Sequence, residues 1–505
     1  MSISPRMPVI VGVGQISQRH KDPELSLEPV DLLAEAARLA DADTGSSRSL
    51  VSNADTVAVV DILSWKYLDP SALLGSRLGI TPKHAITTTV GGNSPQMLVN
   101  QLAVGIQLGE YDTVLVGGVE CMNTRLRAMR ADPKVWLPWH SADDAPCADV
   151  RGDGRPGSSQ FEMAHHALAP TQVYPLFETA CRAALNHDIA THQNHIGQLW
   201  SHFSEVASLN PNASSGSPYS SNDITQISPK NRMVAFPYTK RMCANIDVDQ
   251  AAALLLCSYE AAESAGVPDS QMVFPLAGAD AHDHYFFSER DSLAESTAIG
   301  IAARAALEAA GTCLDDISRF DLYSCFPSAV QAALSSLDLS GPEGGDTRPL
   351  TVTGGLGFAG GPGNNYVTHS IAAMVDACRM DPGSIGMVTA LGWYVTKHSI
   401  GLYSTTPPST EFKFVDQAVT QDAADALPRR QVTGPFDGKA TVEATSVVFD
   451  RDGSTSLGII SALANDGRRA LAISHDRDYL DSMCAEAWEG REIAMRADGV
   501  TNNLV

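Results

Sequence analysis

The run TTTVGGNSPQ at residues 87–96 decides the fold, together with the apolar run MLVNQLAVGIQL at 97–108 and YDTVLVGGVE at 111–120 that follow it. This pattern predicts a strand, a tight turn at the two glycines, a helix and a second strand. Ser94 is a favourable N-cap and Pro95 a favourable first helical residue, so we expect the helix to begin there. Its free backbone N–H groups and its dipole then favour a carbonyl oxygen or an anion beside the turn.

The composition excludes several classes of protein. A chain of 505 residues is too long for one hydrophobic core, so roughly two to four domains are expected. The formal net charge of −23 argues against a nucleic-acid partner, because phosphates require a basic face. Nine scattered cysteines without a C-x-x-C pair argue against a disulfide framework and a zinc site, and we expect no metal. No run approaches the ~18 apolar residues of a membrane span and no signal peptide is recognisable, so we expect a cytoplasmic protein.

The same order of elements occurs in both halves of the chain. An apolar strand, a helix and another apolar strand are expected at residues 8–14, 29–39 and 54–61, and again at residues 274–279, 298–310 and 317–326. Such a duplication predicts two similar α/β halves, each with a mixed sheet covered by helices.

The segment between the halves, residues 121–240, differs in character. It is rich in aromatic residues, histidine, proline and small polar residues, and its periodicity is limited. We expect a lid or a binding subdomain that contains a helix at about 174–187.

The C-terminal part follows the linker TTPPST at 405–410. A run rich in β-branched residues at 439–449 is joined by Asp-Gly turns to further strand-like runs at 457–463 and 469–474. This pattern predicts a three-stranded meander. A small barrel of the oligonucleotide-binding (OB-like) type is the expected fold, although the acidic charge argues against nucleic acid as its ligand.

Four stretches in a fixed order resemble the thiolase superfamily, especially its sterol-carrier-type and thiolase-like branch. They are the turn around Gly92, DLYSCF at 321–326, TGGLGFAGGPG at 353–363 and ALGWY at 390–394. In the family these places hold the nucleophile region, the Asn-Glu-Ala-Phe or His-Asp-Cys-Phe motif, the Gly-Gly…Gly-His-Pro motif and the strand before a Cys-x-Gly loop.

The resemblance covers about residues 1–404 and implies a duplicated, five-layered α-β-α-β-α thiolase fold. The implied domains are a first half at 1–120 plus 241–273, a loop domain at 121–240, a second half at 274–404 and an additional β-rich domain at 411–505. Thiolases usually dimerise through the sheet of the first half, so the resemblance also implies a possible homodimer.

The residues at the family's catalytic positions do not match the family's chemistry. Gly92 stands at the nucleophilic cysteine, Tyr323 at the asparagine or histidine, Gly361 at the histidine of Gly-His-Pro, and Gly392 at the strand end before the acid/base cysteine. A glycine offers no nucleophile, so thiolysis or Claisen condensation by the family mechanism is not expected. No catalytic residue is assigned with certainty.

Substitute groups are sought among the polar residues near these motifs. The pocket candidates are Ser94, Tyr323, Tyr394 and His398, with Ser324, Cys325 and Lys397 as further residues to consider. The expected ligand-binding residues are Gly91, Gly92, Asn93, Ser94, Gly360 and Gly361. The turn at Gly91 and Gly92 is equally consistent with a thioester or oxyanion pocket and with a remnant of the fold's tight turn.

Two functions remain open at this point. The first is a protein resembling acetyl-CoA acetyltransferase, an acyltransferase by resemblance, that binds coenzyme A, acyl-CoA or a related thioester in lipid metabolism. Four basic residues of the predicted loop domain are the candidates for the phosphates of coenzyme A: Arg125, Arg127, Arg130 and Lys134. The alternative is a non-catalytic scaffold or partner subunit whose C-terminal domain docks another protein.

Overall fold

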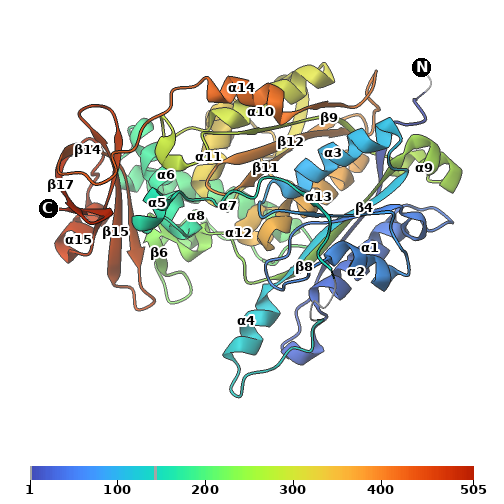
Figure 1. Cartoon of the computed structure of the whole chain (residues 1–505), viewed down its shortest axis with the longest axis horizontal. Coiled ribbons are helices and arrows are strands. Elements are labelled where there is room, and N and C mark those ends of the chain that lie inside the picture. Colours follow the sequence, from blue (N-terminus) through green and yellow to red (C-terminus); the bar gives the residue numbers. More distant parts are fainter. Residues whose placement is uncertain (1–2, 141–144) are drawn as a thin grey trace.

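The computed structural model describes residues 3–140 and 145–505 (Figure 1). Residues 1–2 and 141–144, which fall in the predicted first half and loop domain, lie outside the described residues.

The first half is built on a six-stranded sheet with the order β1-β8-β4-β2-β3-β5. Strands β1, β8 and β4 are antiparallel neighbours, whereas β4, β2, β3 and β5 run parallel. Its elements are β1 (Pro8–Ser17), α1 (Pro29–Asp43), β2 (Thr56–Val59), α2 (Pro70–Leu78), β3 (His84–Thr88), α3 (Ser94–Leu108), β4 (Thr113–Cys121), β5 (Asp149–Arg151), β8 (Asp249–Ser258) and α9 (Tyr259–Ala265). The predicted strand, turn, helix and strand around Gly92 are thus β3, the turn, α3 and β4.

The second half has a five-stranded sheet with the order β10-β11-β12-β9-β13. Its elements are β9 (Phe274–His282), α10 (Thr297–Ala310), β10 (Ile317–Asp321), α11 (Pro327–Ser336), α12 (Gly355–Phe358), α13 (Tyr366–Met380), β11 (Ile385–Gly392), β12 (Lys397–Ser404), β13 (Lys413–Val415) and α14 (Gln417–Asp425). Strand β13 pairs with β9 and α14 packs on β9, so both join this half although residues 411–425 were predicted in the C-terminal domain.

The two sheets enclose a shared layer of helices. Helices α3 and α13 contact each other and strands of both sheets, while α1 covers the first sheet from outside and α10 the second. This gives the α-β-α-β-α order of the thiolase fold. Strand β4, which follows α3, and strand β12, which follows the loop after Gly392, are buried along their whole length.

The segment between the halves is more helical than its sequence suggested. It contains α4 (Met122–Arg130), α5 (Gln160–Ala164), α6 (Pro170–Ala184), α7 (Ile189–Leu209), α8 (Ser221–Thr225), β6 (Met233–Phe236) and β7 (Tyr238–Thr239). The predicted helix at 174–187 corresponds to α6, but the longer helix α7 was not predicted. Its buried face includes polar residues, among them His192 and Ser204, which conceal the helical period of Ile196, Trp200 and Phe203.

The C-terminal strands close on themselves. The elements are β14 (Gly438–Phe449), β15 (Thr455–Ala464), β16 (Arg469–Ser474), α15 (Arg477–Ala485), β17 (Glu492–Asp498) and β18 (Thr501–Leu504). They pair in the order β15-β16-β18-β17-β14, and β14 also pairs with β15, which closes the ring. The predicted meander is confirmed by the antiparallel registers of β14 with β15 and of β15 with β16. Gly453 and Gly467 hold positive φ angles of 91° and 84° in the two turns.

This closed sheet is attached to the rest of the chain through buried polar contacts. Strand β14 pairs with β6 of the segment between the halves. Arg469 is fully buried and binds Glu443 through Nη2 and Oε1 at 2.7 Å. Its Nη1 also donates to the carbonyl oxygens of Ser288 at 3.0 Å and Arg290 at 2.5 Å. One guanidinium therefore joins the C-terminal strands to the second half, which lies beside them in Figure 1.

Among the described residues, no helix combines the length and the apolar composition needed to cross a membrane.

Replacing Arg469 with methionine is expected to cost about 3–5 kcal/mol of stability, because Glu443 and the carbonyl groups lose their partner in a buried place. Chemical denaturation followed by circular dichroism measures the loss. The neighbouring Arg468 is a matched control, since its side chain is 41% exposed and forms an ion pair with the exposed Asp466. Its replacement with methionine should change stability by less than about 0.5 kcal/mol. Equal effects of the two changes would show that the buried guanidinium does not hold the domain.

Candidate functional site

The helix behind the Gly-Gly turn begins one residue earlier than expected. Ser94 is the first residue of α3 and Asn93 is its N-cap, so the prediction of Ser94 as N-cap was wrong. The Ser94 hydroxyl instead donates to the carbonyl oxygen of Thr89 at 3.2 Å, which ties the helix to the strand before it. The Asn93 side chain makes no cap bond, and its Oδ1 is buried without a partner among the described residues.

Gly92 has no room for a side chain. A Cβ atom at this position would overlap the hydroxyl of Tyr323 and would lie 2.5 Å from the carbonyl oxygen of Leu391. The space that a nucleophilic side chain would need is therefore occupied by a tyrosine and by backbone of the second half. This crowding explains in steric terms why glycine stands there.

Tyr323 is held as a neutral hydroxyl beside Gly92. Its ring packs edge-on against Tyr366, with 5.6 Å between the ring centroids, and 7% of the residue is exposed. Burial raises the pKa of its hydroxyl well above the usual value, and nearby Cys325 acts in the same direction. At neutral pH Tyr323 can donate a hydrogen bond, but it is neither a base nor an anionic nucleophile.

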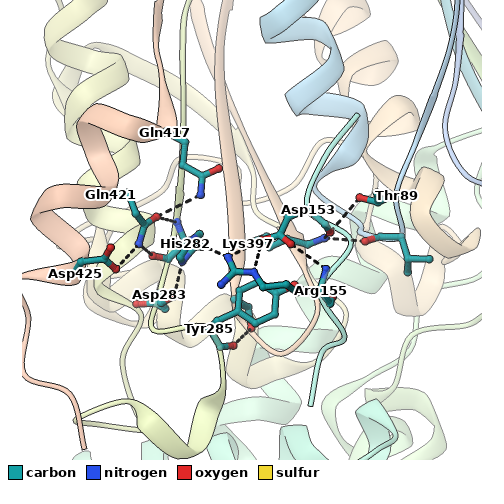
Figure 2. A network of polar contacts seen from close by, with 12 residues as sticks. Thr89, Asp153, Arg155, His282, Asp283, Tyr285, Lys397, Gln417, Gln421 and Asp425 are labelled. Atoms are coloured by element: carbon teal, nitrogen blue, oxygen red, sulfur yellow. Dashed lines mark hydrogen bonds and ion pairs between the residues drawn. The ribbon is translucent and has the colours of Figure 1, made fainter. Parts of the chain in front are cut away.

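Gly91 and Gly392 meet a lysine that the motif comparison did not single out. A Cβ atom on Gly91 would lie 2.8 Å from Lys397 Nζ, and one on Gly392 would lie 2.9 Å from Lys397 Cε. The Nζ atom donates to the carbonyl oxygens of Val90 at 2.7 Å and Asp153 at 3.2 Å (Figure 2). Burial lowers the pKa of Lys397 to about 8, Asp153 opposes the shift, and Arg155 adds to it.

Gly360 and Gly361 of the Gly-rich loop in the second half contact residues other than those of the Gly-Gly turn. The backbone N–H of Gly361 donates to the carbonyl oxygen of Asn245 at 2.8 Å, and Gly360 has a φ of 126° and lies against the side chain of Gln250. The loop reaches the Gly-Gly turn through Asn364, whose Oδ1 accepts from the N–H of Gly91 at 3.0 Å.

Asn364 is a site residue that the sequence did not reveal. It directly follows the Gly-rich motif at 353–363, but its partner Gly91 is distant in the chain, so only the fold identifies the contact.

Tyr394 and His398 do not reach Gly92. The Tyr394 hydroxyl donates to the carbonyl oxygen of Leu168. The Nε2 atom of His398 lies 3.1 Å from Ser296 Oγ and 3.3 Å from Asp283 Oδ2, where β12 packs against α10. Both side chains are committed to buried structural contacts.

Cys325 is a core thiol. It is buried, and burial raises its pKa to about 12, so it carries no thiolate at neutral pH. All nine cysteines lie in the described part of the chain, and all are free thiols.

A cavity of about 330 Å³ opens beside Asn93 and Lys397. Other lining residues come from α3, from β9 and from the segment around β13 and α14: Met97, Gln101, Asp280, His282, Phe414, Asp416 and Gln417. Burial raises the pKa of the Asp280 carboxyl to about 7, although Asn100 Nδ2, 3.2 Å away, opposes the shift.

A second cavity, of about 400 Å³, is basic. Its lining includes Lys230, Lys240, Arg241 and Tyr219, and it borders Phe358 of the Gly-rich loop. The Arg241 guanidinium lies 4.2 Å from the centre of the Tyr219 ring.

Two of the basic residues predicted to bind the phosphates of coenzyme A instead donate hydrogen bonds to backbone carbonyl oxygens. Arg125 donates to the carbonyl oxygen of Ser64 at 3.1 Å, and Arg127 to those of His20 and Lys21 at 3.0 Å. Among residues 3–140 and 145–505, no group of three or more histidine, cysteine, aspartate or glutamate side chains could hold a metal ion.

Comparison with known proteins places this geometry in a family. Residues 420–500 match the model of the thiolase-like protein type 1 additional C-terminal domain. No curated protein matches the chain in sequence.

Solved structures match over much more of the chain. The crystal structure of a monomeric SCP2-thiolase like protein type 1 from Mycobacterium smegmatis is 32% identical with a TM-score of 0.84, and the match covers 100% of both chains.

More distant structures share the fold alone. The Ltp2-ChsH2(DUF35) aldolase is 17% identical with a TM-score of 0.60, covering 80% of this chain and 99% of the other. Human mitochondrial 3-ketoacyl-CoA thiolase in complex with CoA is also 17% identical, with a TM-score of 0.56 and the same coverage of 80% and 99%. The chain belongs to the type 1 SCP2-thiolase-like proteins of the thiolase superfamily and carries their additional C-terminal domain.

Proposed function

We propose that this protein binds an acyl-CoA or a related thioester on the thiolase scaffold and acts without an acyl-cysteine intermediate. The observation that carries the proposal is the packing at Gly92, where the Tyr323 hydroxyl and the Leu391 carbonyl fill the place of a nucleophilic side chain. A thioester carbonyl beside this turn would meet the start of α3 and a neutral hydroxyl donor. These groups stabilise a developing negative charge on oxygen.

Such a site suits a reaction that passes through an enolate without covalent attachment, and decarboxylation of an acyl thioester is one example. The resemblance to thiolases also suggests an acyltransferase of lipid metabolism. This alternative is weaker, because neither cysteine of the family mechanism has a counterpart at the matching positions of this sequence.

The basic cavity is our candidate for the nucleotide end of coenzyme A. Lys230, Lys240 and Arg241 supply positive charge for phosphates, and Tyr219 supplies an aromatic face. The cavity borders the Gly-rich loop, which in turn contacts the Gly-Gly turn through Asn364. Support by analogy comes from the human thiolase that was solved in complex with CoA.

The contacts of the C-terminal domain favour the acyl-CoA proposal over the hypothesis of a scaffold that docks another protein. We interpret its closed five-stranded ring as an OB-like barrel, and it packs on its own chain through β6 and Arg469. A homodimer through the first sheet is also not favoured, because β5 covers the outer edge of β3. The free thiols suit a reducing compartment, which supports the proposed cytoplasmic location.

The variant Gly92→Cys is expected to remain inactive in thiolysis of acetoacetyl-CoA and to lose about 1–3 kcal/mol of stability, because a Cβ atom overlaps Tyr323 and the Leu391 backbone. A thiolysis assay and thermal unfolding provide the two readouts. Gly216→Cys is the matched control, since a Cβ atom there has open space within 4 Å. Thiolysis by Gly92→Cys at native stability would contradict the steric account.

Coenzyme A is expected to raise the melting temperature of the wild-type protein, because a ligand of the native state stabilises it by RT ln(1 + [L]/Kd). Replacing Lys230 and Lys240 together with alanine should weaken binding by about tenfold, equivalent to about 1.4 kcal/mol, as measured by calorimetry. Replacing Lys83, an exposed lysine of the first half, should leave the affinity unchanged. The absence of any shift with coenzyme A or a panel of acyl-CoAs would refute the binding proposal.

A further inference from the structure

The cavity beside the Gly-Gly turn has a polar inner wall formed by two paired strands. In the antiparallel register of β12 with β9, Lys397 lies opposite His282, and Ser399 lies opposite Asp280. Directly opposite residues share a face of a sheet, so Lys397, His282 and Asp280 point the same way. This face looks toward α3, since Asn100 of that helix binds Asp280.

Asn93 supplies an independent sign that the cavity takes a ligand. It lines the cavity, 7% of it is exposed, and its Oδ1 has no partner among the described residues. Buried amide groups are nearly always hydrogen-bonded. A polar molecule in the cavity would complete the bonding of this side chain.

Two backbone carbonyl oxygens hold the Lys397 nitrogen at the wall of the cavity. Those of Val90 and Asp153 accept from it at 2.7 and 3.2 Å, and the centre of the Trp393 ring lies 5.9 Å away. An uncharged amine can keep both hydrogen bonds and still carry a lone pair. Burial lowers the pKa of Lys397 to about 8, so about a tenth of the amine is uncharged at pH 7 and about half at pH 8.

We propose that Lys397 is a nucleophilic amine that forms an imine with a small polar aldehyde or ketone held in this cavity. The amine lone pair attacks the carbonyl carbon, and the carbonyl oxygen becomes the hydroxyl of a carbinolamine after proton transfer from the nitrogen. The carbinolamine then loses this hydroxyl as water while the C=N bond forms, and the resulting protonated imine returns its nitrogen proton to the carboxylate that protonated the hydroxyl. Asp280 supplies the proton for the departing water, since its carboxyl has a pKa of about 7 and is partly protonated near neutral pH.

The last elements of the second half, β13 and α14, complete the site. Phe414 of β13, Asp416 at the N-cap of α14 and Gln417 of α14 form one wall of the cavity. In Figure 2, α14 contributes Gln417 and Gln421 to the network that surrounds His282 and Lys397.

Reductive trapping on the wild-type full chain tests the proposal. The protein is incubated with acetoacetate and cyanoborohydride between pH 6 and 10, and labelled lysines are located by peptide mass spectrometry. We expect Lys397 to be labelled at least tenfold faster at pH 8 than the exposed Lys83 and Lys230. Its rate should rise with a midpoint near pH 8, because the amine loses its proton there, whereas exposed lysines in general titrate near about 10.4.

Asp153 and Arg155 act on the pKa of Lys397, and the other titratable side chains that line the cavity are Asp280, His282, His398 and Asp416. The variant Asp280→Asn should slow the labelling of Lys397 severalfold at pH 7 without changing that of Lys83, and an unchanged rate would refute the role of Asp280. Lys397→Arg, which keeps donors for both carbonyl groups, serves as the control for assigning the labelled peptide. Labelling of Lys397 no faster than that of the exposed lysines would overturn the proposal. Lys397 would then have only a structural role, in binding the two carbonyl groups.

Discussion

The close approach of two backbones at Gly92 is the constraint on which the rest of the site depends. Gly91 and Gly92 belong to the first half, whereas Tyr323, Leu391 and Lys397 belong to the second. Because a Cβ atom on Gly92 would overlap Tyr323, the two halves meet more closely here than a cysteine would allow. Helix α3 lies in the layer shared by both sheets, so its start is fixed by both of them. A change at this turn therefore alters packing and chemistry together.

A second feature of the structure is that further strands pair with the edges of its sheets. Strand β13 covers the edge of β9, β5 covers the edge of β3, and β14 closes onto β15. Unpaired edges invite pairing with other chains. The pairing of β14 with β15 removes an edge, whereas β5 and β13 become the outer strands of their own sheets. The buried guanidinium of Arg469 also fixes the orientation of the C-terminal strands, since it binds both Glu443 and the carbonyl oxygens of Phe287, Ser288 and Arg290.

The sequence predicted those features that depend on local pattern. Alternating apolar runs identified β1, α1 and β2, and the Asp-Gly turns identified β14 to β16. The order of the four motifs also placed Gly92, Tyr323, Gly361 and Gly392 at one expected site. Gly92 lies against Tyr323 and Leu391, whereas Gly361 lies against Asn245 and Ala244. Helix α7 was missed because its buried face mixes histidine and serine with apolar residues. The place of β13 was missed because three residues carry little pattern and their pairing with β9 is set by the tertiary structure.

The part of the site that no pattern could reveal is the register of β12 with β9. Lys397 was only one of several polar candidates, and Asp280 was not considered. His282 and its partner across the sheet, Lys397, are 115 positions apart in the chain. The register places an amine and a carboxyl in one buried face, where burial raises the pKa of Asp280 and lowers that of Lys397. Both shifts reflect a free-energy cost of desolvation that apolar residues of similar size would avoid. Tyr323 and Leu391 already fill the space beside Gly92, and the Oδ1 of Asn93 has no partner among the described residues. We therefore propose chemistry at Lys397 rather than at Gly92.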